Sequence, residues 1–226
     1  MKTLVISDFD GTISTRDVGY EIIERFTGEG WKEIDRAYCA GEIGSRDAYI
    51  QITSLFRGTK EEMVRYVLNR ASMDPHFNEF YLFCKEKEID IKIVSDGLDF
   101  YIDVILKKYG LGDIEFFSNV VGFHNGRASS IEFPHHNGRC KKCGTCKSTL
   151  LEQYRQTYDR IIYVGDGYSD VCPAKDADVV FAKGILYEKC LENGRSCIHY
   201  ENFRDVEDHI RERLSATASP ARVGYR

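Results

Sequence analysis

The sequence lacks several features that mark whole classes of protein. Its 226 residues contain no run of about 18 apolar residues, which a membrane-spanning helix needs. The first residues show no long apolar segment with a cleavage site of the kind that directs secretion. Basic residues are not in excess, because 31 lysines and arginines stand against 36 acidic residues, for a net charge of -5. We therefore expect a cytoplasmic protein that binds neither membranes nor nucleic acid.

The remaining composition is that of a globular protein. Hydrophobic residues make up 42% of the chain, enough for a sizeable core, and the length suits one large domain or a core domain with an insertion. The eight cysteines, without a secretion signal, are expected to be reduced thiols. We find no internal repeat, and the sequence leaves the oligomeric state open.

Residues 4–12, LVISDFDGT, form the most informative segment. A short apolar run predicts a buried strand, and it ends in two carboxylates, Asp8 and Asp10, followed by Gly11. Glycine allows a sharp turn, so that the next amides and Thr12 can surround an anion. Taken alone, this pattern fits an Asp-Gly turn after an edge strand equally well.

The rest of the chain divides into a helical block and an alternating region. Amphipathic helices are predicted at 17–26, 31–38, 46–56 and 60–70, which makes residues 14–74 a helical insertion. Beyond it, strands at 89–94, 114–121, 160–164 and 178–182 alternate with helices at 78–87, 98–109, 148–157 and 204–214, with a further helix starting at 170–175. Residues 122–146 read as a polar loop or hairpin. This order predicts an α/β fold with a parallel sheet covered by helices.

Polar residues follow three of the predicted strands. Asp8 and Asp10 end the first, Ser95-Asp96-Gly97 the second, and Asp166 to Asp170 the third. Because the carboxyl ends of parallel strands meet at one edge, these groups are expected to share a crevice. Phosphoryl transfer needs such a set. Carboxylates can hold Mg²⁺, the Ser95 hydroxyl and the amides after it can donate to phosphate, and Lys147, at a helix start, can balance the charge.

In type, order and spacing these motifs resemble those of haloacid dehalogenase-type phosphatases over nearly the whole chain. The resemblance implies a Rossmann-like core of residues 1–13 and 75–214 and a small helical cap of residues 14–74 inserted after the first strand. Residues 215–226, rich in small residues and without periodicity, are expected to form a disordered tail. The resemblance also implies that Asp8 is the nucleophile, forming an aspartyl-phosphate, and that Asp10 is the general acid and then base. Mg²⁺ would be held by Asp8, the Asp10 carbonyl and Asp166, with Asp170 supporting them. Phosphate would be bound by Thr12, Ser95, Asp96, Gly97 and Lys147.

The cap and several local segments bear on the substrate. The position of the cap is similar to that in phosphoserine phosphatases, and Asp17, Tyr20 and Arg46 are candidate substrate contacts within it. However, residues 49–53 offer no counterpart of the arginine that binds the phosphoserine carboxylate, and Ser-Asp-Gly replaces Ser-Gly-Gly. Three segments, CKKCGTCK, SDGLDFYI and DADVVFAKGILYEKCLENG, are closer to 2-hydroxy-3-keto-5-methylthiopentenyl-1-phosphate phosphatases of methionine salvage. GDGYSDVCPAKDAD also resembles phosphocholine and pyridoxal-phosphate phosphatases.

The sequence therefore predicts a Mg²⁺-dependent phosphomonoesterase that acts on a small phosphorylated metabolite. A non-catalytic sensor of phosphorylated ligands is the alternative from another class, although a binder would not need Asp10. A phosphotransferase such as a mutase remains a third reading.

The cysteine run at Cys140, Cys143 and Cys146 is a candidate zinc site. His135 or His136 would supply the fourth ligand, since tetrahedral sulfur and nitrogen sites suit zinc. No second C-x-x-C pair accompanies the run. The alternative is a tight loop whose thiols pack or oxidise.

Overall fold

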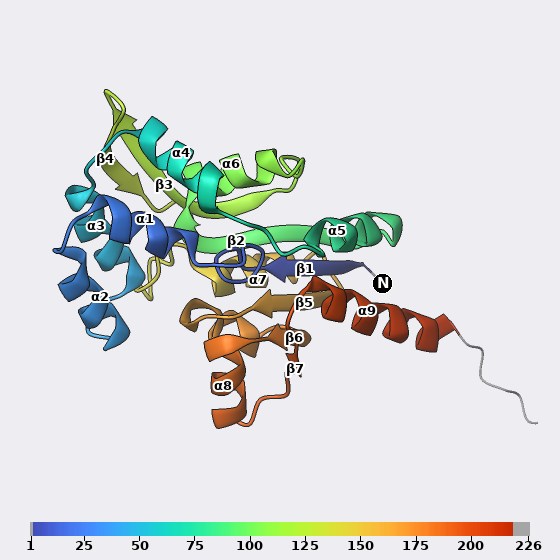
Figure 1. Ribbon diagram of the computed structural model, residues 1–226. Coiled ribbons are helices and arrows are strands. Elements are labelled where there is room, and N and C mark those ends of the chain that lie inside the picture. Colours follow the sequence, from blue (N-terminus) through green and yellow to red (C-terminus); the bar gives the residue numbers. More distant parts are fainter. Residues whose placement is uncertain (1, 219–226) are drawn as a thin grey trace, which may run out of the picture.

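A seven-stranded sheet forms the centre of the protein, in a computed structural model that describes residues 2–218 (Figure 1). The strand order is β4-β3-β2-β1-β5-β6-β7. The strands are β1 (Thr3–Ser7), β2 (Asp90–Leu98), β3 (Phe116–His124), β4 (Arg127–Glu132), β5 (Arg160–Gly165), β6 (Val179–Ala182) and β7 (Ile198–His199). Neighbouring strands run parallel, except in the β3–β4 hairpin. The predicted α/β fold is confirmed.

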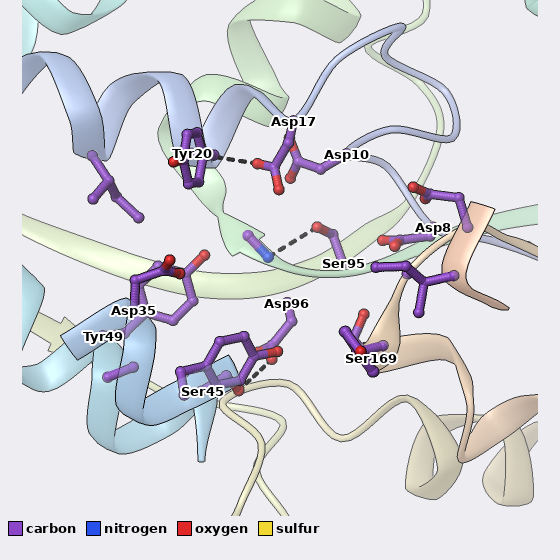
Figure 2. A pocket seen from close by; sticks show the side chains of 18 of the residues that line it. Asp8, Asp10, Asp17, Tyr20, Asp35, Ser45, Tyr49, Ser95, Asp96 and Ser169 are labelled. Atoms are coloured by element: carbon purple, nitrogen blue, oxygen red, sulfur yellow. Dashed lines mark hydrogen bonds between the residues drawn. The ribbon is translucent and has the colours of Figure 1, made fainter. Parts of the chain in front are cut away.

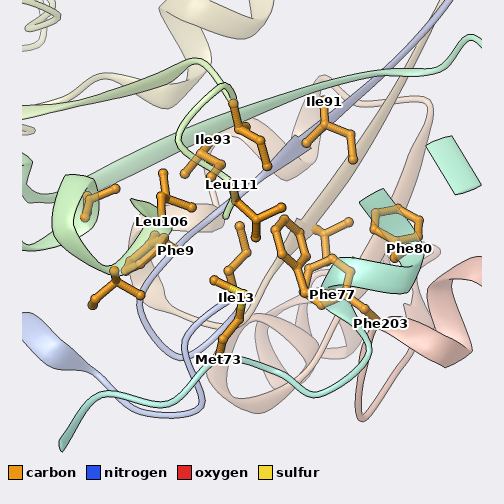
Figure 3. Close-up of a cluster of buried hydrophobic side chains, with 14 of the residues drawn as sticks. Phe9, Ile13, Met73, Phe77, Phe80, Ile91, Ile93, Leu106, Leu111 and Phe203 are labelled. Carbon is orange, nitrogen blue, oxygen red and sulfur yellow. The ribbon is translucent and has the colours of Figure 1, made fainter. Parts of the chain in front are cut away.

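Helices cover both faces of the sheet, because alternate side chains of the apolar strands point to opposite sides. Val5 of β1 packs into one buried cluster with helices α5 (Phe77–Glu86), α6 (Asp99–Lys108) and α9 (Phe203–Ala218). Figure 3 shows part of this cluster, where Phe77, Phe80 and Phe203 lie together. Leu4 and Ile6 pack on the other face with α7 (Lys147–Tyr154) and α8 (Gly184–Glu192). The end of β1 is thereby held between two packed layers.

The segment that follows β1 forms four helices, as predicted. These are α1 (Val18–Phe26), α2 (Trp31–Cys39), α3 (Ser45–Leu55) and α4 (Lys60–Arg70). Helices α1, α2 and α3 enclose a small apolar cluster of their own, which includes Trp31 and Ile52. Helices α1 and α4 bury side chains in the first large cluster. The connections into and out of the segment run side by side at an isolated bridge between Ser14 and Met73. The exact boundaries of core and cap stay a prediction.

Two sequence expectations need correction. In place of a helix starting at 170–175 the chain forms two 3₁₀ turns, η1 (Tyr168–Asp170) and η2 (Pro173–Lys175). Pro173 has no N–H to continue a helix. The tail predicted to be disordered from residue 215 is helical through Ala218, where Ser215 still donates to the Arg211 carbonyl at 2.9 Å. The same prediction for 219–226 lies outside the described residues.

Two elements were missed, namely α8 and the two-residue strand β7. No helix within residues 2–218 has the length and apolar character needed to cross a membrane.

Candidate active site

The first candidate residue, Asp8, lies directly after β1 at the carboxyl edge of the sheet. Its amide donates to the Val164 carbonyl of β5 at 2.9 Å, which extends the ladder by one residue. The Lys147 ammonium, 1% exposed at the start of α7, lies 2.8 Å from Asp8 Oδ1 and 2.7 Å from Asp170 Oδ1. Tyr163 donates to the same Asp170 oxygen at 2.6 Å. Lys147 therefore joins two buried carboxylates from different parts of the chain.

The electrostatics of this group are dominated by burial. Burial and the Asp170 charge raise the pKa of Asp8 well above its usual value, although Lys147 opposes them. Burial also raises the pKa of Asp166, to about 6. Burial acts on Asp170 in the same direction, but Lys147 and the Tyr163 hydrogen bond outweigh it and hold the pKa of Asp170 below its usual value. The three carboxylates carry more negative charge than Lys147 balances, so a bound cation would be stabilised here.

The donor set fits a divalent metal. Carboxylate oxygens of Asp8, Asp166 and Asp170 lie within 4.8 Å of one another, and in residues 2–218 this is the one such group of three. Hard oxygen ligands of this kind suit Mg²⁺. Asp170 Oδ2 also accepts the Asp166 and Gly167 amides, at 3.0 and 2.9 Å, which suits the supporting position predicted for it.

Thr12 contributes to this group in a way that the sequence did not indicate. Its hydroxyl is buried and donates to Asp166 Oδ1 at 2.7 Å. Gly11, with φ of +70°, passes so close that a Cβ there would lie 2.4 Å from Asp166 Oδ2. Both residues hold the Asp166 carboxylate, and a contact of Thr12 with phosphate stays a prediction.

The Asp10 carboxylate points away from this group toward the cap. Its Oδ1 accepts the amides of Val18 and Gly19 at 2.9 and 3.3 Å, and its Oδ2 accepts the Tyr101 hydroxyl. Burial and the charge of Asp17 raise the pKa of Asp10 to about 7, against these hydrogen bonds. Asp10 is therefore poised to hold or release a proton near neutral pH.

Ser95, Asp96 and Gly97 lie at the end of β2 and line the same cavity as Asp8. The Ser95 hydroxyl accepts the Gly97 amide at 2.9 Å. The Asp96 carboxylate is engaged elsewhere: it accepts the Ser45 hydroxyl of α3 and, at 2.8 Å, the Thr145 amide. Any phosphate contact of Asp96 is thus left to its backbone amide, because its side chain joins the cap to the core.

A cavity of about 300 Å³ lies between the cap helices and the sheet edge (Figure 2). Asp17 and Tyr20 line it, but Arg46 does not, because its guanidinium packs 5.5 Å from the centre of the Phe133 ring. The expected substrate contact of Arg46 is therefore not supported. Among the described residues, the lining contains no lysine or arginine.

Several lining residues were missed in the sequence, above all Asp35, Tyr38, Ser45 and Tyr49. Positions 45, 48, 49 and 52 all line the cavity, and they share the spacing of one helical face, which was the available signal. Tyr101 had no such signal, because it reaches Asp10 only through the tertiary fold.

In the described part of the chain, the thiols of the cysteine run do not lie close enough together to make a group of metal ligands. None of its thiols belongs to a group of three ligands within 4.8 Å. Cys140 is exposed, whereas Cys146 is buried and accepts the Thr149 hydroxyl at 3.2 Å. The geometry thus favours the alternative of a packed loop. That loop contacts the cap, since the Gly144 amide donates to the Ser45 hydroxyl at 3.2 Å.

The fold, with its aspartate site at the carboxyl edge of the sheet, can be compared with the folds of solved phosphatases. Among solved structures, a substrate-bound phosphoserine phosphatase complex has a TM-score of 0.71 at 23% identity, covering 92% of this chain and 98% of the other. Phosphoserine phosphatase from T. onnurineus has a TM-score of 0.70 at 20% identity, covering 93% and 94%. At these identities the likeness shows a shared fold.

The family is shown by sequence. The model of the family described as "Putative Phosphatase" matches residues 3–203, and the chain belongs to this family. It is 30% identical to the 2-hydroxy-3-keto-5-methylthiopentenyl-1-phosphate phosphatase of Bacillus thuringiensis (strain Al Hakam), over 95% of this chain and 98% of that protein. It is 32% identical to the bifunctional enzyme MtnB/MtnX of Bacillus licheniformis over 93% of its own length, but spans only 50% of that relative. The protein is a phosphoric monoester hydrolase.

Proposed function

We propose that the protein hydrolyses the phosphomonoester of a small metabolite in two steps. Asp8 attacks phosphorus while Asp10 gives its proton to the departing oxygen, which leaves an aspartyl-phosphate. Asp10 then takes a proton from water as the water attacks phosphorus, and Asp8 is released. The observation that carries this proposal is that both carboxylates line one cavity while their surroundings differ: Asp8 is paired with Lys147, and Asp10 has a pKa of about 7.

The other residues of the site neutralise and orient the phosphate. Lys147 offsets the charge of Asp8 and is placed to stabilise charge on the transferring group, and the Ser95 hydroxyl faces the same cavity. We assign the magnesium site to Asp8, Asp166 and the Asp10 carbonyl, with Asp170 in support. Bound there, Mg²⁺ reduces the repulsion between an anionic nucleophile and an anionic phosphate.

For the substrate, we propose first the methionine-salvage phosphate named for the relatives that match nearly the whole chain. That name describes a methylthiopentenyl chain without a second anionic group. The cavity offers such a chain apolar neighbours, because its lining includes tyrosines and Ile23, Ala48 and Ile52 beside the carboxylates. Phosphoserine fits less well, since its carboxylate would face Asp17 and Asp35.

A second candidate is a phosphate ester of an amino alcohol, such as phosphocholine. Asp17 and Asp35 carry negative charge into the outer part of the cavity, and Tyr20, Tyr38 and Tyr49 supply aromatic rings. A cationic group gains from both kinds of neighbour. This arrangement supports the proposal independently of the relatives.

A panel of phosphorylated metabolites, assayed for released phosphate with and without Mg²⁺, tests these proposals. The panel includes the methionine-salvage phosphate, phosphocholine, phosphoserine and pyridoxal phosphate, with Asp8→Asn as the inactive control. We expect Mg²⁺-dependent turnover that is fastest with the methionine-salvage phosphate or phosphocholine and slowest with phosphoserine. Release from none of them would favour a sensor, and transfer to a second hydroxyl compound would favour a mutase. We place the enzyme in the cytoplasm, in keeping with the eight free thiols of residues 2–218.

A further inference from the structure

The Asp10 carboxylate is held by donors from two different parts of the protein. The first turn of the cap helix α1 supplies the amides of Val18 and Gly19 to Oδ1. The core helix α6 supplies the Tyr101 hydroxyl, 2.5 Å from Oδ2. Each carboxylate oxygen therefore has its own partner, and rotation of the carboxylate plane would break hydrogen bonds on both sides.

The space around the Tyr101 hydroxyl is shaped by two glycines. A Cβ at Gly97 would lie 1.9 Å from the hydroxyl oxygen and 2.6 Å from Asp10 Oδ2. A Cβ at Gly19 would lie 3.0 Å from the same hydroxyl oxygen. Any larger residue at position 97 would displace the hydroxyl or the carboxylate, so the hydrogen bond requires the absence of a side chain there.

The ring that carries this hydroxyl is fixed by packing. Tyr101 is fully buried, with its ring centre 6.3 Å from that of Phe9 and 5.7 Å from that of Phe100. Held in this way, the hydroxyl donates to Asp10 Oδ2. Because Phe9 lies between Asp8 and Asp10, the ring also supports the turn that carries both carboxylates.

We propose that Tyr101 is a positioning residue for the proton transfers of Asp10, an inference that rests on the proposed function. With Oδ2 held by Tyr101 and Oδ1 by the α1 amides, the carboxyl group keeps one orientation toward the leaving oxygen, which lies on the far side of phosphorus from Asp8. In the first step the proton moves from Asp10 to that oxygen as the P–O bond breaks. Tyr101 exchanges no proton; it limits the orientations from which the transfer starts.

The test compares Tyr101→Phe with Tyr158→Phe. The control removes a hydroxyl of the same kind, since Tyr158 donates to Asp90 at 2.7 Å, and neither of these two residues lines the cavity. The kcat/KM of each variant is measured for p-nitrophenyl phosphate and for the best alkyl phosphate of the metabolite panel. This ratio covers the steps up to departure of the leaving group. Inorganic phosphate, as a competitive inhibitor, reports binding.

For Tyr101→Phe we expect kcat/KM to fall at least tenfold with the alkyl ester and less than threefold with p-nitrophenyl phosphate. Nitrophenolate can depart without being protonated, whereas an alkoxide leaving group needs a proton from Asp10. The inhibition constant of inorganic phosphate should stay within twofold, and Tyr158→Phe should match the parent with both esters.

Three results would overturn the inference: an unchanged kcat/KM for the alkyl ester, equal losses with both esters, or the same losses in Tyr158→Phe. An unchanged kcat/KM for the alkyl ester would leave the proposed function in place, provided that Asp8→Asn inactivates the parent enzyme. A parent that hydrolyses no phosphomonoester removes both.

Discussion

Replacement of Lys147 by methionine tests the buried ion pairs most directly. Methionine keeps much of the length and the apolar contacts of the lysine side chain while removing its charge. In the parent, the ammonium lies within 2.8 Å of both Asp8 and Asp170, and all three side chains are at least 92% buried, since their exposed fractions are 1%, 8% and 0%. The substitution leaves two carboxylates in a site closed to water, with Asp166 close by.

The expected loss of unfolding free energy is large because Asp8 and Asp170 lose the positive charge of Lys147 but remain buried. Removing one partner of a buried pair destabilises a protein by about 3–5 kcal/mol. A surface pair is worth about 0–1 kcal/mol. Lys189→Met is the matched control, since that lysine pairs with Glu192 at 2.7 Å on the protein surface. The two variants should therefore differ severalfold in lost unfolding free energy.

The loss in Lys147→Met should depend on pH in a definite direction. In the parent, Lys147 lowers the pKa of Asp170, so this group stabilises the fold above its unfolded pKa, and the contribution is lost only as pH falls through the lowered value. Without Lys147, burial raises the pKa of Asp170, and that of Asp8 further still. Such groups stabilise the fold at low pH and lose that contribution as pH rises through the raised pKa. The difference in unfolding free energy between the parent and Lys147→Met should be larger at pH 8 than at pH 5.

Urea unfolding followed by circular dichroism at both pH values measures this gap. A loss below about 1 kcal/mol at pH 8, or one equal at the two pH values, would refute the reasoning. Added Mg²⁺ should restore part of the stability, because it supplies positive charge to the same carboxylates. The kcat of whatever variant remains folded should fall about 100-fold, as expected when a group that stabilises the transition state is removed.

Three further predictions concern other parts of the site. Asp8→Asn should abolish turnover in a protein that still folds, as circular dichroism would show. Phosphate release within about tenfold of the parent, 1.4 kcal/mol in barrier, would exclude Asp8 as the nucleophile. Ser45→Ala removes the cap's hydrogen bond to Asp96, so KM should rise about two- to tenfold, in line with about 0.5–1.5 kcal/mol per hydrogen bond, and an unchanged KM would mean that this contact does not hold the cap. Protein purified without chelator should contain less than about 0.2 zinc per chain by elemental analysis, whereas one zinc per chain would restore the site at 140–146.

The parts of the fold and site that follow local rules could be predicted from the sequence. Apolar runs predicted β1 and β5, and the polar residues after them were expected at one edge because parallel strands share their direction. The structure brings Asp8, Asp166 and Lys147 together as that rule requires.

The parts that depend on tertiary contacts could not be predicted. The hydrogen bond from Tyr101 to Asp10 spans 91 residues, and that from Ser45 to Asp96 spans 51, so no local pattern marks either one. Helix α8 was not predicted. It begins at Gly184, whose φ of +52° changes the direction of the backbone after β6. The expected helix at 170–175 failed because the Asp170 side chain accepts backbone amides just before it, an alternative to continuing helical turns.

The position of β1 has a consequence for how the chain is made. β1 precedes the other six strands of residues 2–218 in the chain, yet it lies in the middle of the sheet, between β2 and β5. Its partner on one side begins only at Asp90, and its partner on the other begins at Arg160. During synthesis, the edge of β1 that pairs with β5 therefore stays unpaired until the residues from Arg160 onward have been made. Truncation before Arg160 would leave that edge unpaired for good, where it can recruit strands from other molecules and lead to aggregation.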